Sequence, residues 1–452
     1  MKNQDGAAWK RDLYILAPMR FPLPNPETIK LLARRHLGLG ADGLCEIQTY
    51  GGGACNELYF LKTHDGYFLM RVSLPVRLLQ KTMSEVATIE FARSEISMPV
   101  PTIVAYHPST RNELGFEWML MGMMPGEPLD KKWTKLPMSA KEELVRQLAR
   151  YQAKLFEKRF LRIGSLYKSS DYEVAETPTD PAIDPQLSNL QTTQIPLTVG
   201  RAASTSFVWD HYNHDVRRGP FKNSYEWLHA RLTLSLADQE ETMKNWDSED
   251  EEDVEISNIA IKAVLGLLEM LPNIFLPTET IETTIVHHDD LRMSNILVDD
   301  AGKITGIVDW EFVCTLPLWR ACQLPYALES RDREKGPNRE DYPTELTSPT
   351  PGNEPPKDSA GDEGVNSLFW EHLVEYELTK LRRVFISEME QIQPGWVEEW
   401  KNGALKAEFE KAVEFLDNDY CFKLVGRWVD AYQSGQPFSL KKGFLEDLKT
   451  NW

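Results

Sequence analysis

The chain has 452 residues, 42% of them hydrophobic and 26% charged, which is the composition of a globular protein with two or three packed lobes. Its net charge of −19 at pH 7 argues against a nucleic-acid partner, and no apolar stretch is long enough to form a membrane span. Five scattered cysteines without Cys-x-x-Cys spacing predict reduced, buried thiols in a cytoplasmic protein.

Residues 1–40 are predicted to form an N-terminal extension with one helix over residues 26–37. Three β-strand patterns come next, at residues 43–50, 57–63 and 67–73. The turn between the first two strands holds Gly51, Gly52 and Gly53, which would let the backbone approach nucleotide phosphates. A glycine triplet alone is more often a flexible turn, and this one gains weight only from its position ahead of the motifs described below.

The third strand carries Arg71 between large apolar residues, and the helix predicted over residues 82–94 carries Glu85 and Glu90. A forked guanidinium can bridge phosphate oxygens and a carboxylate, so Arg71 is a candidate phosphate ligand with one of the two glutamates as its partner. The two glutamates lie almost one and a half helical turns apart and therefore face different directions. The alternative is a surface arginine on an edge strand, which the apolar neighbours disfavour.

A further strand over residues 116–121 ends in a segment that contains Met121 and Met123, and the pattern beyond residue 126 becomes helical. Helices are predicted at residues 139–156, 224–236, 256–271, 368–389 and 398–432. Residues 247–255 hold a run of acidic side chains, which indicates a solvated loop or helix start more than a substrate site. Residues 331–364 are rich in proline and charge and are predicted to form a disordered loop.

The strongest signal is a β-hairpin within residues 283–311. His288 and Asp290 precede its first strand, Asn295 begins that strand, and Asp309 follows the second strand. Phosphoryl transfer needs a carboxylate that deprotonates the attacking hydroxyl and hard oxygen ligands for the magnesium that bridges the phosphates. A solvated acidic turn would explain a lone pair of Asp and Asn. The histidine, the apolar strands and the second aspartate in register favour a catalytic loop instead.

The segments His288-Asp289-Asp290-Leu291, Asn295-Ile296-Leu297-Val298 and Val308-Asp309-Trp310-Glu311 resemble the aminoglycoside phosphotransferase and choline-kinase-like family. That family has the pattern His-Gly-Asp-Leu-x-x-x-Asn-Ile-Leu-Val, followed by Ile-Asp-Trp-Glu. Gly200 and the segment Arg218-Gly219-Pro220-Phe221 resemble an insertion of its fungal members. The resemblance implies an α+β, protein-kinase-like fold with two lobes. A small antiparallel sheet would form an N-lobe over residues 41–125, and a mainly helical C-lobe would span residues 126–452.

The resemblance also assigns roles to the residues of the hairpin. It implies that Asp290 is the catalytic base, that His288 braces the loop, and that Asn295 and Asp309 bind Mg²⁺. Asp289 stands where many members of the family have glycine. Its negative charge beside the base is expected to change substrate handling without abolishing activity.

On the nucleotide side, the resemblance places the glycine turn and Arg71 at the phosphates. It favours Glu85 as the partner of Arg71, because the family has its glutamate just ahead of Val-Ala, and leaves Glu90 as the fallback. Backbone groups near Met121 and Met123 would meet the adenine, while the methionine side chains themselves are expected to be core residues.

The expected function is therefore a Mg²⁺-dependent phosphotransferase that uses ATP, with GTP as an alternative, and acts on a hydroxyl group of a small molecule. The acceptor would be an aminoglycoside, an amino alcohol or a related metabolite. A nucleotide-binding regulatory protein of pseudokinase type is the alternative, although none of the expected catalytic residues is missing. A different transfer reaction on the same fold also stays open.

Overall fold

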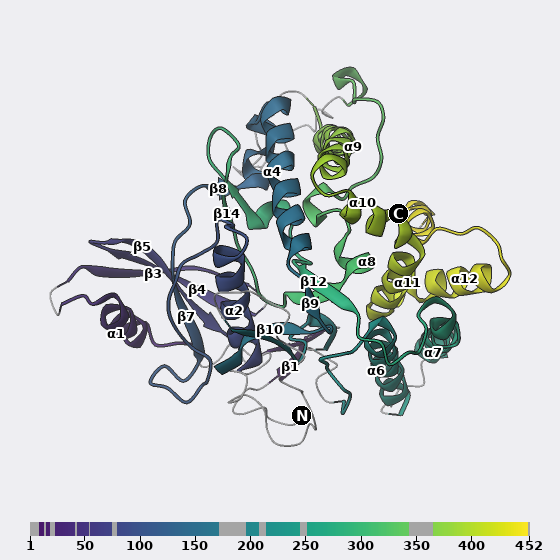
Figure 1. Cartoon of the computed structure of the whole chain (residues 1–452), viewed down its shortest axis with the longest axis horizontal. Coiled ribbons are helices and arrows are strands. Elements are labelled where there is room, and N and C mark those ends of the chain that lie inside the picture. Colours follow the sequence, from purple (N-terminus) through teal and green to yellow (C-terminus); the bar gives the residue numbers. More distant parts are fainter. Residues whose placement is uncertain are drawn as a thin grey trace, which may run out of the picture.

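The computed structural model describes residues 9–12, 15–18, 23–40, 43–53, 55–74, 79–170, 196–207, 214–244, 251–342 and 365–450. Figure 1 shows a smaller lobe built on a β-sheet and a larger lobe made mainly of helices. The predicted α+β class, with a small antiparallel sheet and a helical C-terminal part, is confirmed.

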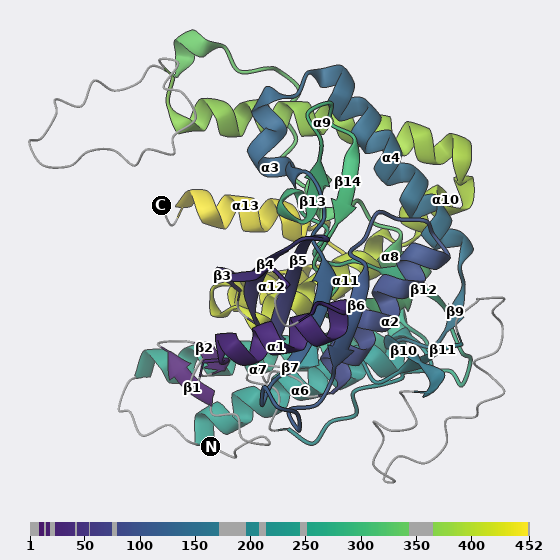
Figure 2. The same cartoon turned by 90° about the vertical axis from the view of Figure 1, so that its left-hand side faces the viewer.

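The small lobe is built on an antiparallel sheet with the strand order β3-β4-β5-β7-β6. Its strands are β3 (Cys45–Gly52), β4 (Asn56–Thr63), β5 (Gly66–Ser73), β6 (Ile103–His107) and β7 (Glu117–Gly122). Helix α1 (Pro26–Leu37) and helix α2 (Gln80–Ser94) lie on opposite faces of this sheet (Figure 2). Side chains alternate between the faces of a strand, so Met70 and Val72 of β5 pack with the apolar residues of α1. Arg71 and Ser73 face the other way, toward α2.

Helix α1 follows from the local sequence. The Asn25 side chain accepts a hydrogen bond from the N–H of Glu27 (2.9 Å), and Pro26 occupies the first turn. Gly38 ends the helix in the left-handed region, with φ of 67°. The N-terminal extension also contains a strand pair that was not predicted, β1 (Trp9–Asp12) with β2 (Ile15–Pro18).

The segment that joins the lobes is held against the catalytic hairpin. After β7 the chain forms β8 (Glu127–Pro128), which pairs with β13 (Ile296–Val298) of the hairpin, and β13 pairs in turn with β14 (Ile304–Ile307). Gly126 lies just before β8 with φ of 101°, and a Cβ at this position would come within 2.7 Å of the Val298 carbonyl oxygen. Only glycine fits there, so the connection between the lobes and the hairpin are packed as one unit.

The large lobe surrounds a second small sheet with the strand order β15-β12-β9. The strands of the lobe, other than those already named, are β9 (Phe160–Leu161), β10 (Ser165–Lys168), β11 (Leu197–Gly200), β12 (Thr283–His287) and β15 (Cys314–Pro317). Its helices are α3 (Leu129–Lys132), α4 (Met138–Glu157), α6 (Ser224–Lys244), α7 (Glu251–Ile274), α8 (Leu318–Ala321), α9 (Ser367–Ile392), α10 (Pro394–Asn402), α11 (Ala404–Glu414), α12 (Phe422–Gln433) and α13 (Leu440–Thr450).

The prediction of one continuous helix over residues 398–432 is wrong. Helix α10 ends at Asn402, and Gly403 follows, where a Cβ would come within 3.0 Å of the Cβ of Trp319. The chain then forms α11, passes through two 3-10 turns, and begins α12 at Phe422. Residues 251–255 of the acidic run form the start of α7, in line with the predicted helix start, and residues 247–250 lie outside the described residues.

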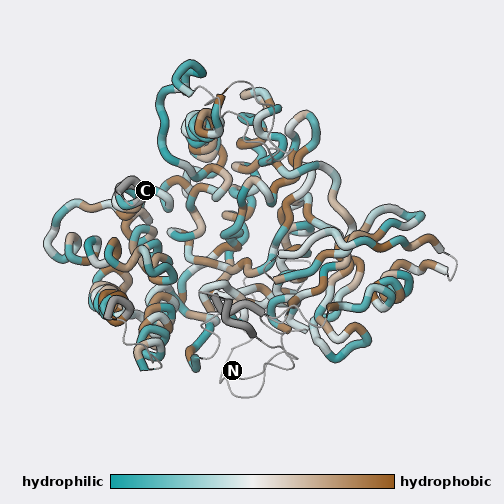
Figure 3. Tube along the Cα trace, turned by 180° about the vertical axis from the view of Figure 1, so that it is seen from behind, coloured by the Kyte–Doolittle hydropathy of each residue, from teal (hydrophilic) through white to brown (hydrophobic). Residues whose placement is uncertain are grey.

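The predicted disordered loop is ordered in the part that the structure describes. Residues 331–342 form a hydrophilic segment ahead of α9 (Figure 3), and this segment packs on α9. The Arg333 N–H donates to Thr379 Oγ1 (2.9 Å), and its guanidinium donates to Glu375 (2.9 Å). Residues 343–364 lie outside the described residues.

All five cysteines are buried and free, as predicted. Over the described ranges, no helix is both long enough and apolar enough to cross a lipid bilayer.

Candidate active site

The hairpin brings Asp290 and Asn295 into contact. Strand β12 leads into the loop that carries Asp290, and a 3-10 turn over Met293–Asn295 then delivers Asn295 at the start of β13. The Asn295 Nδ2 group donates to the backbone carbonyl of Asp290 (2.9 Å) and to its Oδ2 atom (3.0 Å). Arg292 contacts the other carboxylate oxygen of Asp290. The Asp290 carboxylate is half exposed, so it is held by its own loop and still open to solvent.

Asp309 lies at the end of the hairpin in a strained backbone conformation. Its φ is 64°, a region that a non-glycine residue adopts only when the surrounding structure imposes it. Burial in the protein interior, followed by the negative charges of Glu311 and Asp290, raises the pKa of its carboxyl group to about 6. Within the described part of the chain, this carboxylate has no hydrogen-bond or ion-pair partner. A bound cation would supply the missing positive charge.

The available donor atoms fit a hard divalent cation. The amide nitrogen of Asn295 is committed to Asp290, which leaves its carbonyl oxygen Oδ1 as the ligand atom. Together with the Asp309 carboxylate, this gives the oxygen donors that Mg²⁺ prefers. The assignment of Asn295 and Asp309 as metal ligands stays a prediction that this geometry supports.

His288 connects the loop to the end of strand β14. Its Nε2 atom contacts the Val308 carbonyl oxygen (3.3 Å), and its ring packs edge-on against Trp310, with 4.9 Å between the ring centroids. Val308 and Trp310 flank Asp309, so this buried ring ties the base-bearing loop to the second aspartate. Burial lowers the pKa of His288 to about 4, which keeps the ring neutral so that Nε2–H donates to Val308.

His288→Gln is expected to flatten the dependence of stability on pH between about 6.5 and 4. In the wild type the folded state resists protonation of this histidine while the unfolded state accepts a proton below its ordinary pKa of 6.5. Stability therefore falls with decreasing pH by about 1.4 kcal/mol per pH unit, and by about 3 kcal/mol in total. The glutamine amide keeps a donor for Val308 without titrating. Urea unfolding from pH 8 to pH 4 measures the effect, and His229→Gln, at an exposed histidine, is the control. Parallel curves for wild type and His288→Gln would show that His288 does not titrate this way.

The N-lobe pairs Arg71 with Glu85. Arg71 lies on the face of β5 that is turned to α2, and its guanidinium contacts the Glu85 carboxylate, with both side chains buried. Glu90 instead forms an ion pair with Lys168 (2.9 Å). The structure thus brings Arg71 to the preferred glutamate and excludes the fallback. Their role toward a nucleotide stays a prediction.

A second buried cation, Lys81, was missed at the sequence level. Its Nζ atom donates to Asn56 Oδ1 (2.8 Å) and to Glu311 Oε2 (2.8 Å). Asn56 also donates to the same Glu311 oxygen (2.8 Å), and Arg71 lies 3.9 Å from it. Burial alone would raise the pKa of Glu311, but Lys81 and Arg71 outweigh burial and lower it. Glu311 therefore joins the hairpin of the large lobe to the cations of the small lobe.

A weak sequence signal for Lys81 exists in hindsight. Lys81 and Glu85 are four residues apart on one face of α2, and Arg71 and Ser73 are two residues apart on one face of β5. Ser73 is also the cross-strand partner of Asn56. Helix α2 and strand β5 therefore meet through two pairs of residues, Arg71 with Glu85 and Ser73 with Lys81. The sequence indicated only the first pair.

The glycine turn and the segment with Met121 and Met123 are the two other parts of the small lobe that were expected to contact the nucleotide. Gly52 ends β3, where a Cβ would lie 2.8 Å from a carboxylate oxygen of Glu57, whereas nothing lies within 4 Å of a Cβ built at Gly51 or Gly53. The Met123 N–H donates to the Tyr67 carbonyl (3.0 Å), so this donor is used within the small lobe. On the Met123 backbone, the carbonyl oxygen is then the group that could hydrogen-bond to an adenine. The Met121 side chain is buried in the core, as expected, whereas the Met123 side chain is only partly buried.

Comparison with known proteins gives a family match and several partial relatives. The model of the family described as phosphotransferase enzymes matches residues 46–320. A subtelomeric hrmA-associated cluster protein of Aspergillus fumigatus is 31% identical over 131 residues, which cover 28% of this chain and 26% of that protein. Altered inheritance of mitochondria protein 9, mitochondrial, of Eremothecium gossypii is 29% identical over 178 residues, covering 35% of this chain and 29% of that protein. The chain thus matches less than a third of the length of these relatives.

Solved structures that are similar to this chain include aminoglycoside phosphotransferases. The apo form of a thermostable mutant of aminoglycoside phosphotransferase APH(4)-Ia has a TM-score of 0.42 and 11% identity, covering 90% of this chain and 100% of that chain. The streptomycin-ATP-APH(2")-IIa ternary complex has a TM-score of 0.40 and 11% identity, covering 94% of this chain and 97% of that chain.

Proposed function

The chain belongs to the phosphotransferase enzyme family, and from that premise we propose that it transfers the γ-phosphoryl group of ATP or GTP to a hydroxyl group of a small molecule. The observation that carries the proposal is the contact of Asp290 with Asn295, next to the carboxylate of Asp309, which has no partner among the described residues. A half-exposed carboxylate held by its own loop is suited to accept a proton from a bound hydroxyl.

Each residue of the site then has a defined task. Asp290 accepts the proton of the acceptor hydroxyl as that oxygen bonds to the γ-phosphorus, and the bond to the bridging oxygen breaks to release the nucleoside diphosphate. Asn295 orients Asp290, and His288 fixes the loop that carries both. Arg71, held by Glu85, would bind phosphate oxygens. Mg²⁺, bound by Asn295 and Asp309, would supply positive charge to the phosphates.

The acceptor class is an aminoglycoside, an amino alcohol or a related metabolite. Incubation with ATP or GTP labelled at the γ position, and with panels of amino sugars, choline-like amines and sugars, tests the proposal. Transfer of the label to one panel is expected. Nucleotide binding without transfer to any member would favour the regulatory, pseudokinase-type alternative.

Nucleotide binding is expected to require a divalent cation, because Asp309 and the phosphates are both negative and need a positive ion between them. Calorimetric titration with ATP, with Mg²⁺ and with excess chelator, measures this. Chelation should weaken binding by at least tenfold. Asp309→Asn should weaken the Mg²⁺-dependent part of the ATP affinity. Asp300→Asn, in the exposed hairpin turn, should have no effect on that affinity. Equal affinity with and without chelator would disprove the metal assignment.

Arg71→Ala is expected to weaken nucleotide binding by about 1.5–3 kcal/mol, the contribution of a hydrogen bond to a charged group. Arg71→Lys should recover only part of the lost binding free energy, since an ammonium group lacks the two-pronged geometry of a guanidinium. Glu85→Ala should cost less, and the double variant should add little, because residues in contact are not additive. Lys62→Ala, at an exposed ion pair on β4, is the control. Additive effects near zero in the ATP titrations would place the phosphate-binding strand elsewhere.

A further inference from the structure

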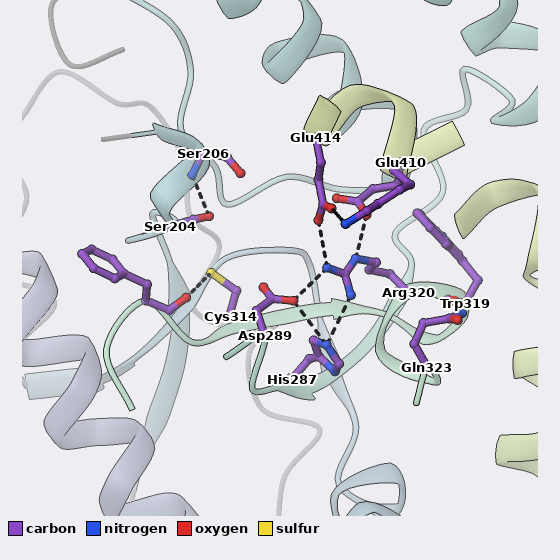
Figure 4. A network of polar contacts seen from close by, with 12 residues as sticks. Ser204, Ser206, His287, Asp289, Cys314, Trp319, Arg320, Gln323, Glu410 and Glu414 are labelled. Atoms are coloured by element: carbon purple, nitrogen blue, oxygen red, sulfur yellow. Dashed lines mark hydrogen bonds and ion pairs between the residues drawn. The ribbon is translucent and has the colours of Figure 1, made fainter. Parts of the chain in front are cut away.

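Arg320 lies at the centre of an ion-pair cluster that reaches the catalytic loop (Figure 4). Its Nη2 atom donates to Asp289 Oδ1 (2.8 Å) and lies 3.3 Å from Glu414 Oε1. Its Nε atom donates to Glu410 Oε2 (2.9 Å), and its Nη1 atom lies 3.3 Å from His287 Nε2. These five residues, Arg320, Asp289, His287, Glu410 and Glu414, are called the Arg320 cluster below.

The fold brings the cluster together from three parts of the chain. Strand β12 ends at His287 and runs into the loop with Asp289, and β15 pairs with β12 and leads directly into α8, which carries Arg320. Glu410 and Glu414 are four residues apart and therefore share one face of α11. The family match ends at residue 320, so α11 is an element of this chain that the family model does not cover.

The charges of the cluster balance within the protein. The carboxylates of Asp289, Glu410 and Glu414 meet the cations of Arg320, Arg231 and Lys411. Burial alone would raise the pKa of Asp289, but the guanidinium of Arg320 and a hydrogen bond from His287 outweigh burial and lower it. Asp289 is therefore a charged, paired residue of the scaffold. This explains how the chain accommodates an aspartate where the family pattern has glycine.

The side-chain contacts of Asp290 and His288 stay within the hairpin. Asp290 contacts Arg292 in the loop and Asn295 at the start of β13, and His288 contacts the Val308 carbonyl oxygen next to Asp309. The bond from Asp289 to Arg320, in contrast, joins the loop to α8 and through Glu410 to α11. Asp289 is the residue directly before the proposed base, so its anchor limits how far Asp290 can move.

We propose that Arg320 is a positioning residue that holds the catalytic loop through Asp289, and that α11 thereby forms part of the active-site scaffold. The catalytic consequence rests on the proposed function of Asp290. A displacement of a catalytic group by about 1 Å can lower the rate of a reaction by about 10²-fold.

Asp289→Asn is the first test, because it removes the charge while leaving the buried bond between Arg320 and Glu410 in place. We expect kcat to fall by about tenfold to a hundredfold, with the nucleotide affinity and the melting temperature close to those of the wild type. Arg320→Lys should give a similar loss of kcat, and the double variant should be little worse than either single one. Asp300→Asn removes the aspartate of an exposed ion pair in the same hairpin and is the matched control.

Hydrogen–deuterium exchange provides a readout that does not need turnover. Residues 287–295 should exchange faster in Asp289→Asn than in the wild type or in Asp300→Asn. Unchanged exchange and unchanged kcat in Asp289→Asn would overturn the proposal. A fall in nucleotide affinity equal to the fall in kcat/KM would also overturn it, by indicating a general structural role. If the wild type shows no phosphoryl transfer, the proposed function fails, and the exchange rates still decide whether Asp289 anchors the loop.

Discussion

Asp290→Asn is expected to lower kcat by about 10²- to 10⁴-fold, which is the usual contribution of a positioned general base. Asparagine keeps the shape of the side chain and can still contact Asn295 and Arg292, but it cannot accept the proton of the acceptor hydroxyl. A group that acts in the transition state affects kcat and leaves ground-state binding intact. The nucleotide affinity should therefore stay within a few-fold of the wild type.

The measurement needs an acceptor from the panel assay and a parallel nucleotide titration. Asp300→Asn is the matched control, because it changes an exposed aspartate of the same hairpin from charged to neutral. Retention of more than about half of the wild-type kcat in Asp290→Asn would place the base at another residue. A large loss of nucleotide affinity would show that Asp290 contributes to binding instead.

The second large effect concerns stability. Glu410→Gln is expected to destabilise the protein by about 3–5 kcal/mol, the typical cost of removing one partner from a buried ion pair. One carboxylate oxygen of Glu410 contacts Arg231 (2.5 Å) and the other contacts Arg320 (2.9 Å), and the Glu410 side chain is only 5% exposed. The amide offers one acceptor oxygen and no charge, so two arginines would lose their shared counter-ion.

Denaturant unfolding of the full chain measures this difference. Glu143→Gln is the control, because Glu143 forms a surface ion pair with Arg150 at 3.0 Å and should change stability by less than about 1 kcal/mol. The double variant Glu410→Met with Arg231→Met tests the cause, since replacing both partners by apolar groups should recover part of the loss. A change below about 1 kcal/mol in Glu410→Gln would mean that the cluster is solvated in solution.

The parts of the site that the sequence predicted are local in the chain. His288, Asp290 and Asn295 lie within eight residues, and the hairpin register that adds Asp309 follows from two short apolar strands. The pair of Arg71 with Glu85 spans only one strand and the next helix; the residues themselves left Glu85 and Glu90 open, and the family resemblance favoured Glu85. Periodicity and turn residues are short-range signals, so they reach over such distances along the chain.

The parts that the sequence did not predict depend on contacts between distant segments. Lys81 meets Glu311 across more than two hundred residues, and Arg320 meets Glu410 across ninety. In a single sequence a charged residue is most simply explained as a surface residue, because burial without a visible partner is costly. The interruption of the helix predicted over residues 398–432 also depends on a distant contact, because Gly403 packs closely against Trp319.

The Arg320 cluster also has a consequence for how the chain matures during its synthesis. Arg231 and Arg320 leave the ribosome well before Glu410, which is made about 90 residues after Arg320. At roughly 5–20 residues per second, Arg231 and Arg320 wait for their shared counter-ion Glu410 for at least roughly 5–20 s. Arg320 can meet Asp289 during that time. During that interval the lobe cannot close its interior around them, although the small lobe is already complete. Closure of the large lobe around these two arginines therefore waits for α11, and a chain released before residue 410 would be a substrate for chaperones and proteases.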